Sequence, residues 1–364
     1  MIVIKMKKFL NLFMLLTLLA GWSSCSDNDD PVVSATDGVD ATQQEILKNY
    51  VNEVVIPTYQ SLADAAALLA EDCKNLSTQA AVDKACNDWV EARKYWELSE
   101  AFLFGAAADY SIDPHIDSWP LDLTQLDEVL KAGDIEARIE AGTAGYGLLG
   151  FHAVEYVIFR EGSTGDANNR QREVATISEA EARFAAVAAA DMSEQCDRLV
   201  EAWDGVYGET LYNAGLPGNA KYKTQSAAFE EILIGASDIA NEVANTKIAD
   251  PMASHQWSDV ESPHSWNSVA DFIDNIRSVR NAYYGSLNGT VSASSLSALV
   301  ASKDKTADQK VRNAIDLAIQ MLEAMPRPFR NYISETSGEN YNKIQAAIDA
   351  CNDLVDIIDE IDFL

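Results

Sequence analysis

The sequence predicts an all-α protein built from two helical-bundle halves packed together. Long segments dominated by Ala, Leu, Glu, Asp and Lys are separated by short breaks of Gly, Pro and Asn. No segment sustains the apolar–polar alternation that is typical of a strand. A break from Ala214 to Gly218 lies near the middle of the chain and predicts bundles over 41–215 and 219–364. A duplication would account for halves of similar size, although no repeat is evident in the sequence.

Helix formers, caps and prolines predict the individual helices. Thr42, with a glutamate three residues later, is an N-cap candidate for a first helix over 42–76, which Pro57 should bend. A second helix is expected over 80–104. A structured loop or short turns over 105–123 should follow, because two X-Pro pairs disfavour helix there. Further helices are predicted over 145–160, 178–212, 222–247, 266–285, 306–324 and 339–361.

Residues 1–24 have the features of a secretory signal peptide. Three lysines precede an apolar run over 9–20, which is too short for a spanning helix of about 20 residues. Small residues lead to Cys25, which resembles the lipid-modified first residue of bacterial lipoproteins. Residues 25–40 are acidic and poor in apolar side chains, which predicts a lipid-anchored tether. We expect a cell-envelope protein anchored through Cys25 on the periplasmic or surface face of the outer membrane; cleavage and release is the alternative.

The charge of the chain excludes one class of partner. There are 27 basic and 57 acidic residues, and the signal contains three of the lysines and no acidic residue. A chain this negative repels nucleic acid and anionic lipid headgroups, so nucleic-acid binding is excluded and cations or basic partners are favoured.

Four cysteines follow the lipidation candidate. A disulfide between Cys73 and Cys86 is one interpretation, because the two residues flank a predicted helix–helix turn and an exported protein meets oxidising conditions. Cys196 and Cys351 have no evident partner. The chain contains no CxxC pair, so a structural role is favoured over a zinc or redox site of that kind.

The segment from Gly150 to Tyr156 is the first candidate functional site. On a helix, His152 and Glu155 lie three residues apart on one face, where both side chains can converge on a cation. A bare His-x-x-Glu pattern is nevertheless more often a structural hydrogen bond or ion pair. Both interpretations predict contact between the two side chains.

A second candidate lies on the helix predicted over 80–104. Trp89, Arg93, Trp96 and Glu100 follow a helical stripe, and Glu97 lies one turn from the arginine. This pattern fits either an aromatic core stripe with a buried Arg–Glu pair or an additional carboxylate ligand.

Two further segments add charged side chains. The predicted loop contains several carboxylates, Asp117 among them, together with a histidine and Trp119. Glu261 and Ser265 precede a predicted helix start. That helix N-terminus fits either anion binding or ordinary capping by Ser265 or Asn267, of which capping is the commoner.

Four motifs in this order together resemble the imelysin family. They are Trp-x3-Arg-x2-Trp-Glu-x2-Glu from Trp89, Ile-Asp-Pro-x-Ile-Asp-x-Trp-Pro from Ile112, Gly-x-His-x-x-Glu-Tyr from Gly150 and Glu-Ser-x-x-Ser from Glu261. The resemblance covers essentially the whole chain after the signal. It implies an exported all-helical fold of two bundle-like halves, a site near their interface, and membership among iron-regulated proteins associated with iron uptake.

The resemblance also implies roles for individual residues. His152 and Glu155 occupy the signature positions of the family's proposed metal site, and Glu97 and Glu100 lie in the matching first-half helix as further candidate ligands. The residues expected to line the cleft around the metal are Arg93, Asp117, Trp119, Glu261 and Ser265.

Function follows from the resemblance and from the donor types. One histidine with several carboxylates suits iron, with zinc or calcium as alternatives, so we expect a protein that binds a metal ion or an iron-bearing ligand in an interdomain cleft. It would pass this cargo to an iron-transport partner in the membrane. The alternative is a metallopeptidase that uses His152 and Glu155, since the family was first described through peptidase activity. The absence of an H-E-x-x-H helix argues against an enzyme.

Overall fold

Helices form almost everywhere that the sequence predicts them. The computed structural model describes residues 39–159 and 171–361. Within these ranges there is no strand, and the only β-type pairing is a single bridge between Phe159 and Gln171. The all-α prediction is therefore confirmed. None of the helices in the described part of the chain has the length and apolar character needed to span a bilayer.

The first helical run differs in detail from its prediction. It consists of α1 (Ala41–Tyr50), the π-helical turn η1 (Val51–Val55) and α2 (Ile56–Cys73). The predicted cap was wrong, because the carboxylate of Asp40 accepts a hydrogen bond from Gln43 N at 2.9 Å. Pro57 lies in the first turn of α2, directly after the π-helical turn, and the bend predicted there stays a prediction.

The remaining long helices lie where periodicity predicts them. The segment 105–123, predicted as a structured loop or short turns, contains two helices of only four and five residues. The helices and π-helical turns that follow α2 are α3 (Gln79–Glu97), α4 (Ala106–Asp109), α5 (Ile112–Ile116), α8 (Gly150–Ile158), α9 (Glu179–Ala202), η5 (Trp203–Tyr207), α10 (Gly208–Tyr212), α11 (Gln225–Glu242), η6 (Val243–Ala249), α12 (Asp250–Ser254), α13 (Ser268–Tyr284), α15 (Lys305–Glu323) and α16 (Glu339–Asp359).

Four short helices lie outside the predicted ranges, and one cysteine prediction is wrong. The unpredicted helices are α6 (Leu123–Ala132), α7 (Ile135–Glu140), α12 and α14 (Leu296–Lys303). Cys73 and Cys86 are both buried and form no disulfide, so the prediction of a bridge between them is wrong. The thiol of Cys86 instead lies 3.2 Å from the carbonyl oxygen of Ile158.

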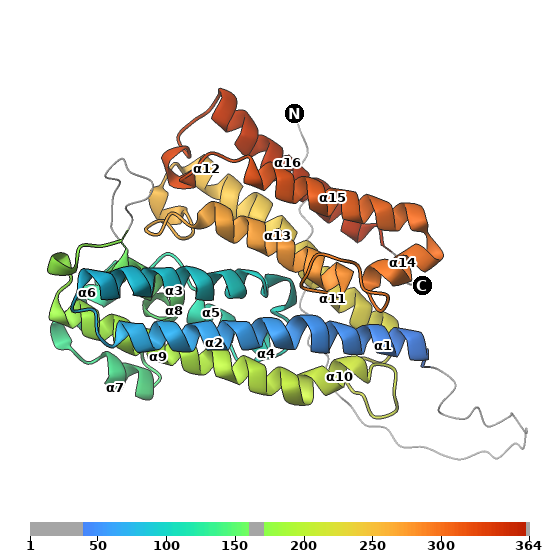
Figure 1. Ribbon diagram of the computed structural model, residues 1–364, viewed down its shortest axis with the longest axis horizontal. Coiled ribbons are helices and arrows are strands. Elements are labelled where there is room, and N and C mark those ends of the chain that lie inside the picture. Colours follow the sequence, from blue (N-terminus) through green and yellow to red (C-terminus); the bar gives the residue numbers. More distant parts are fainter. Residues whose placement is uncertain (1–38, 160–170, 362–364) are drawn as a thin grey trace, which may run out of the picture. The chain divides into compact units, whose positions relative to one another are not determined.

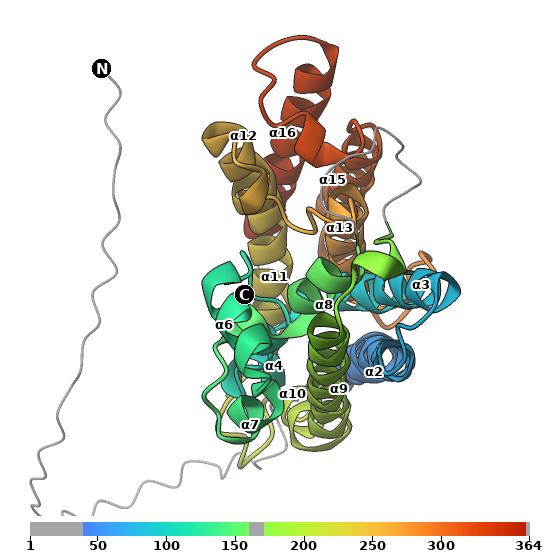
Figure 2. The ribbon, with the colours of Figure 1, turned by 90° about the vertical axis from the view of Figure 1, so that its left-hand side faces the viewer.

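Two groups of helices pack along one another. The first group has α2 between α3 and α9, with α8 against α9, and the second group has α13 and α11 packed on α15 and α16. The groups meet where α13 contacts α3 and where α11 contacts the 3-10 turn η2 (Glu100–Phe102). Figure 2 shows α8 and α3 beneath α13 from a second direction. Gly38–Leu364 form one compact unit, and the boundary predicted near Gly215 stays a prediction.

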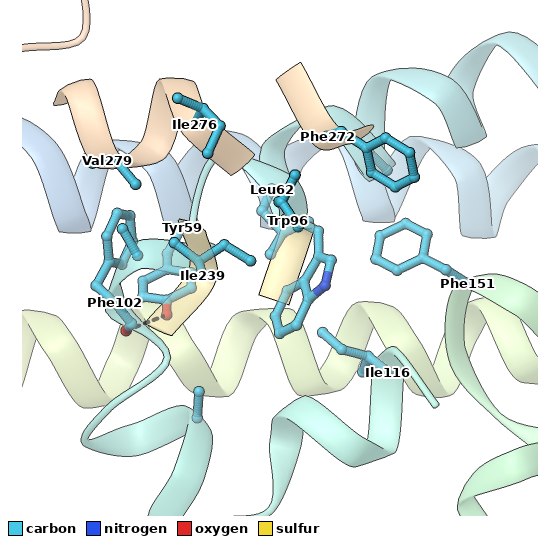
Figure 3. Close-up of a cluster of buried hydrophobic side chains, with 14 of the residues drawn as sticks. Tyr59, Leu62, Trp96, Phe102, Ile116, Phe151, Ile239, Phe272, Ile276 and Val279 are labelled. Atoms are coloured by element: carbon cyan, nitrogen blue, oxygen red, sulfur yellow. Dashed lines mark hydrogen bonds between the residues drawn. The ribbon is translucent and has the colours of Figure 1, made fainter. Parts of the chain in front are cut away.

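Aromatic side chains fill the region where the two groups meet. Figure 3 shows Trp96 and Phe151 facing Phe272 of α13, and all three are fully buried. The hydroxyl of Tyr59 donates a hydrogen bond to the carbonyl of Phe102 at 3.2 Å, which satisfies its one polar atom. Burial of each such ring contributes roughly 1.5–3 kcal/mol. This apolar layer forms one wall of the polar cluster described next.

Candidate metal centre

The guanidinium of Arg93 lies at the centre of a buried cluster of carboxylates. Its Nη1 contacts Asp117, and its Nη2 lies 2.5 Å from Glu97 Oε1 and 2.6 Å from Glu261 Oε1. Its Nε lies 3.8 Å from Asp271 Oδ2. All five side chains are buried. Arg93 therefore connects α3, the segment after α5 and the segment before α13.

Lys247 is the second buried cation of the cluster. Its ammonium lies 3.2 Å from Glu261 Oε1, 3.5 Å from Glu97 Oε2 and 3.8 Å from Glu100 Oε1. The residue belongs to the π-helical turn η6, a geometry that is frequent at functional sites. No role was predicted for Lys247, because a single lysine in a helical segment has the same local pattern as an exposed lysine.

His152 is held between two carboxylates. Its Nδ1 lies 3.3 Å from Glu155 Oε2, and its Nε2 lies 3.2 Å from Asp117 Oδ1 without the alignment of a hydrogen bond. The other oxygen of Glu155 accepts hydrogen bonds from Ser265 N and Oγ, each at 2.7 Å, and from His264 N at 3.1 Å. Contact within the His–Glu pair is therefore confirmed. Glu155 orients the ring, and Nε2 is the nitrogen that faces the cluster.

Gly150 makes the approach of His152 to the cluster possible. It has a φ of +74°, and a Cβ at this position would lie 2.1 Å from the carbonyl oxygen of Ile116. Only glycine fits a backbone contact this close in the left-handed region. The first turn of α8 therefore abuts the end of α5, and this contact brings the imidazole beside Asp117.

A group of three buried side chains has the donors of a metal site. Asp117, His152 and Glu261 each offer one ligand atom, and the three atoms lie within 4.8 Å of one another. Within the described ranges, Glu261 Oε2 is buried and accepts no hydrogen bond. A buried carboxylate oxygen without a partner is costly unless a cation or a proton satisfies it. The donor set of one nitrogen and several oxygens fits a first-row transition metal such as iron.

The sequence of the chain matches one known protein family over most of its length. The family model described as Imelysin, whose family name designates a peptidase, matches residues 55–358. The chain belongs to the imelysin family.

Three similar proteins match this imelysin chain over most of its length. Iron-regulated protein A of Synechococcus elongatus is 28% identical over 303 residues, which are 81% of this chain and 79% of the relative. A crystal structure from Parabacteroides distasonis, named as an iron-regulated protein A precursor, has a TM-score of 0.79 at 27% identity and covers 90% of this chain and 95% of its own. An imelysin-like protein from Psychrobacter arcticum, with a TM-score of 0.66, 13% identity and coverage of 89% and 96%, supports the fold alone.

The carboxylates of the imelysin cluster are themselves held by hydrogen bonds. Trp96 Nε1 donates to Asp117 Oδ2 at 2.6 Å. Asp271 accepts from Ser262 Oγ and from Asn267 Nδ2, each at 2.6 Å. Asn267 occupies the N-cap position of α13, but its side chain does not cap the helix, and no role was predicted for Asp271. These donors fix the carboxylates before any ligand binds.

Ser265 also differs from its predicted role as a helix cap. Its backbone N–H and its hydroxyl both donate to the carboxylate of Glu155. The anion bound by this segment is therefore a side chain of the same molecule. The α13 helix begins three residues later, at Ser268, without a side-chain cap.

Burial and charge shift the pKa values of the cluster in opposite directions. Burial raises the pKa of Glu261 to about 8 and that of Asp271 to about 7. Burial also tends to lower the pKa of His152, but its contacts with Asp117 and Glu155 outweigh this and raise it to about 9. For Asp117 burial acts upward, yet the Arg93 charge holds the pKa well below its usual range. Protons therefore compensate part of the negative charge.

The predicted site residues lie together in this imelysin chain. Trp119 lies beside the cluster, with its ring centroid 6.2 Å from that of His152 and 5.9 Å from Lys247 Nζ. A pocket of about 60 Å³ adjoins the histidine and is walled by Trp119 and Trp257. Contacts within the cluster include His152, Glu155, Glu97, Glu100, Arg93, Asp117, Glu261 and Ser265. Cys25 and the signal lie outside the described residues.

Proposed function

We propose that this imelysin binds iron as cargo through Asp117, His152 and Glu261. The observation that carries the proposal is the convergence of these three buried groups, with one Glu261 oxygen lacking a hydrogen bond among the described residues. Two similar proteins bear the name iron-regulated protein A, which supports a role linked to iron. Carboxylate oxygens with one imidazole nitrogen form a donor set that iron accepts.

Arg93 and Lys247 explain how such a site can stay folded without its ion. Six buried carboxylates surround the two cations and His152, so the negative groups outnumber the positive ones even when the imidazole is protonated. An arriving metal ion must displace the His152 proton and compete with both cations for oxygens. This competition limits affinity and permits release, as a carrier requires.

The location of the protein is part of the proposal and is supported by sequence pattern alone. Residues 1–24 would direct export, and lipid on Cys25 would anchor the protein in the cell envelope. An acidic, anchored chain is suited to capture a cation near the membrane and to deliver it to an iron-transport partner.

A metallopeptidase is the second candidate, because the family name designates a peptidase. That chemistry would require Glu155 to activate water. Burial acts to raise the pKa of Glu155, but His152 and the donors around it lower that pKa to about 2, which makes the group a poor base. Both of its oxygens are also occupied by hydrogen bonds or ion pairs. Binding is therefore the better supported function.

Metal analysis of the chain beginning after Cys25 tests the proposal. We expect about one iron per chain by mass spectrometry after anaerobic loading, and iron affinity at least tenfold weaker in His152→Asn. His255→Asn is the matched control, since the imidazole of His255 lies outside the cluster, 2.8 Å from the carbonyl oxygen of Ile333. Equal iron affinity of the His152→Asn and His255→Asn variants, or no bound iron in the wild type, would contradict the proposal. Cleavage of a peptide library that depends on His152 would favour the peptidase.

A further inference from the structure

A large acidic cavity includes Glu100 of the cluster in its lining, whereas Trp119 and Trp257 line the separate pocket beside His152. Its volume is about 600 Å³, and it is lined by α11 on one side and by the segment from η2 to α5 on the other. Six carboxylates line it, and none of the described lining residues is basic: Glu100, Asp113, Glu230, Glu231, Asp238 and Glu242. At the rim, Glu231 pairs with Lys221 at 3.1 Å. The remaining acids give the cavity a strongly negative potential.

Glu100 joins this cavity to the buried cluster. Its side chain lines the cavity, yet the residue is only 7% exposed. Within the described part of the chain no donor forms a hydrogen bond with its carboxylate, and its only ion pair is the 3.8 Å contact from Oε1 to Lys247. A nearly buried carboxylate with so few partners is expected to take up a cation or a proton.

The ligand groups of the cluster form two overlapping sets. Glu97, Glu100 and Asp117 each offer an oxygen within 4.8 Å of the others, as do the ligand atoms of Asp117, His152 and Glu261. Asp117 belongs to both sets. A cation held by the first set therefore needs to exchange only two ligands to reach the second, without leaving carboxylate contact.

The alternative opening is much less suited to a hydrated ion. The pocket beside His152 has a tenth of the volume of the acidic cavity, and its walls include two tryptophans and two prolines. Glu155 is the one carboxylate among its described lining residues, and both of its oxygens already contact His152 or Ser265. The acidic cavity instead offers six carboxylates and has room for several waters around the ion.

We propose that a metal cation enters through the acidic cavity, is held first by Glu97, Glu100 and Asp117, and then passes to Asp117, His152 and Glu261. The inference rests on the proposed iron site and adds its route and its transfer carboxylate. The cavity acids attract the hydrated ion, and Glu100 is the first ligand that replaces its water.

Binding kinetics separate the route from the site. The test uses ferrous iron under anaerobic stopped flow, with tryptophan fluorescence as the signal and equilibrium titration alongside. In the triple variant Glu230→Gln/Asp238→Asn/Glu242→Gln we expect the association rate constant to fall about tenfold at low ionic strength, and the difference to shrink at about 0.5 M salt. Glu100→Gln should slow association and dissociation together, so that Kd changes less than either rate.

A matched control removes the same charge from another surface. Glu194→Gln/Asp197→Asn/Glu201→Gln changes three exposed acids of α9 that line none of the described cavities, and we expect its association rate to stay within about twofold of wild type. Equal slowing in the two triple variants, or unchanged rates in the cavity variant, would overturn the route while leaving the site intact. Absence of iron binding in the wild type at equilibrium would overturn both proposals.

Discussion

Glu155 and Ser265 lie 110 positions apart in the chain, yet one carboxylate oxygen of Glu155 accepts hydrogen bonds from both the backbone and the hydroxyl of Ser265, each at 2.7 Å. The other oxygen contacts His152 Nδ1. The ring is therefore aligned by a carboxylate that is itself aligned by a distant segment. Such outer hydrogen bonds set the orientation and basicity of a metal-binding imidazole.

Glu155→Gln should damage both stability and iron binding. The variant keeps the shape of the side chain but removes the charge that balances the imidazolium, so we expect a loss of about 3–5 kcal/mol in unfolding free energy and a fall in the pKa of His152. Iron affinity should weaken by about 10–100-fold. Urea unfolding and an NMR titration of the ring measure these effects. Glu128→Gln, on the exposed face of α6, should change neither quantity; a His152 pKa that stays near 9 would refute the orienting role.

Gly150→Ala should be far more destabilising than Gly133→Ala. Both glycines have a positive φ, of +74° and +67°, so alanine costs about 1–2 kcal/mol of backbone strain at either position. At Gly133 no atom lies within 4 Å of the added carbon, whereas at Gly150 the carbon would meet the Ile116 carbonyl. We expect at least about 2 kcal/mol of additional loss at Gly150. Equal losses in chemical unfolding would show that the α5–α8 contact is unimportant.

The metal-free chain should lose stability as the pH rises. The folded-state pKa of Glu261 is about 8 against an ordinary 4.5, and that of His152 is about 9 against 6.5, so the folded state binds more protons than the unfolded state between these values. The stabilisation is complete below the ordinary values and is lost as the pH rises through the folded ones. We expect the unfolding free energy to fall from about pH 5 to about pH 8, by up to about 1.4 kcal/mol per pH unit for each proton.

Urea unfolding in the presence of a chelator, repeated across this pH range, measures the slope. Glu261→Gln removes one of the titrating groups and should flatten it. A stability that rises with pH would contradict the assignment. Saturating iron should also flatten the slope, because a bound cation replaces the protons.

Arg93→Lys should strongly destabilise the fold although it preserves the positive charge. Arg93 uses different nitrogens for Asp117 and for the Glu97 and Glu261 pair, whereas lysine has a single ammonium. A carboxylate left buried without a partner should lower the unfolding free energy by about 3–5 kcal/mol. The control is Arg183→Lys, an exposed residue paired with Glu136, for which we expect a change below about 0.5 kcal/mol. Similar losses in both variants would contradict the network.

Sequence patterns within a few helical turns predicted most of the fold and the contact between His152 and Glu155. Periodicity predicted the long helices, and the spacing of His152 and Glu155 predicted their contact, because both depend on neighbours within one or a few turns. The short helices α6, α7, α12 and α14 were missed, since so few residues carry little periodic signal. The orienting role of Glu155 toward His152, and the direction in which the His152 ring faces, depend on partners far along the chain, such as Ser265 and Lys247. No local pattern contains that information.

Lys247 lies in the π-helical turn η6, so the position of its ammonium depends on the number of residues in that turn as well as on the residue being lysine. A regular helix advances about 100° per residue, and a wider turn accommodates one residue more before the next begins. Removing one residue just before Lys247 would restore regular winding and rotate the lysine out of phase with Glu97 and Glu261. A deletion of a single codon would then take the ammonium out of the cluster while leaving every charged side chain in the sequence.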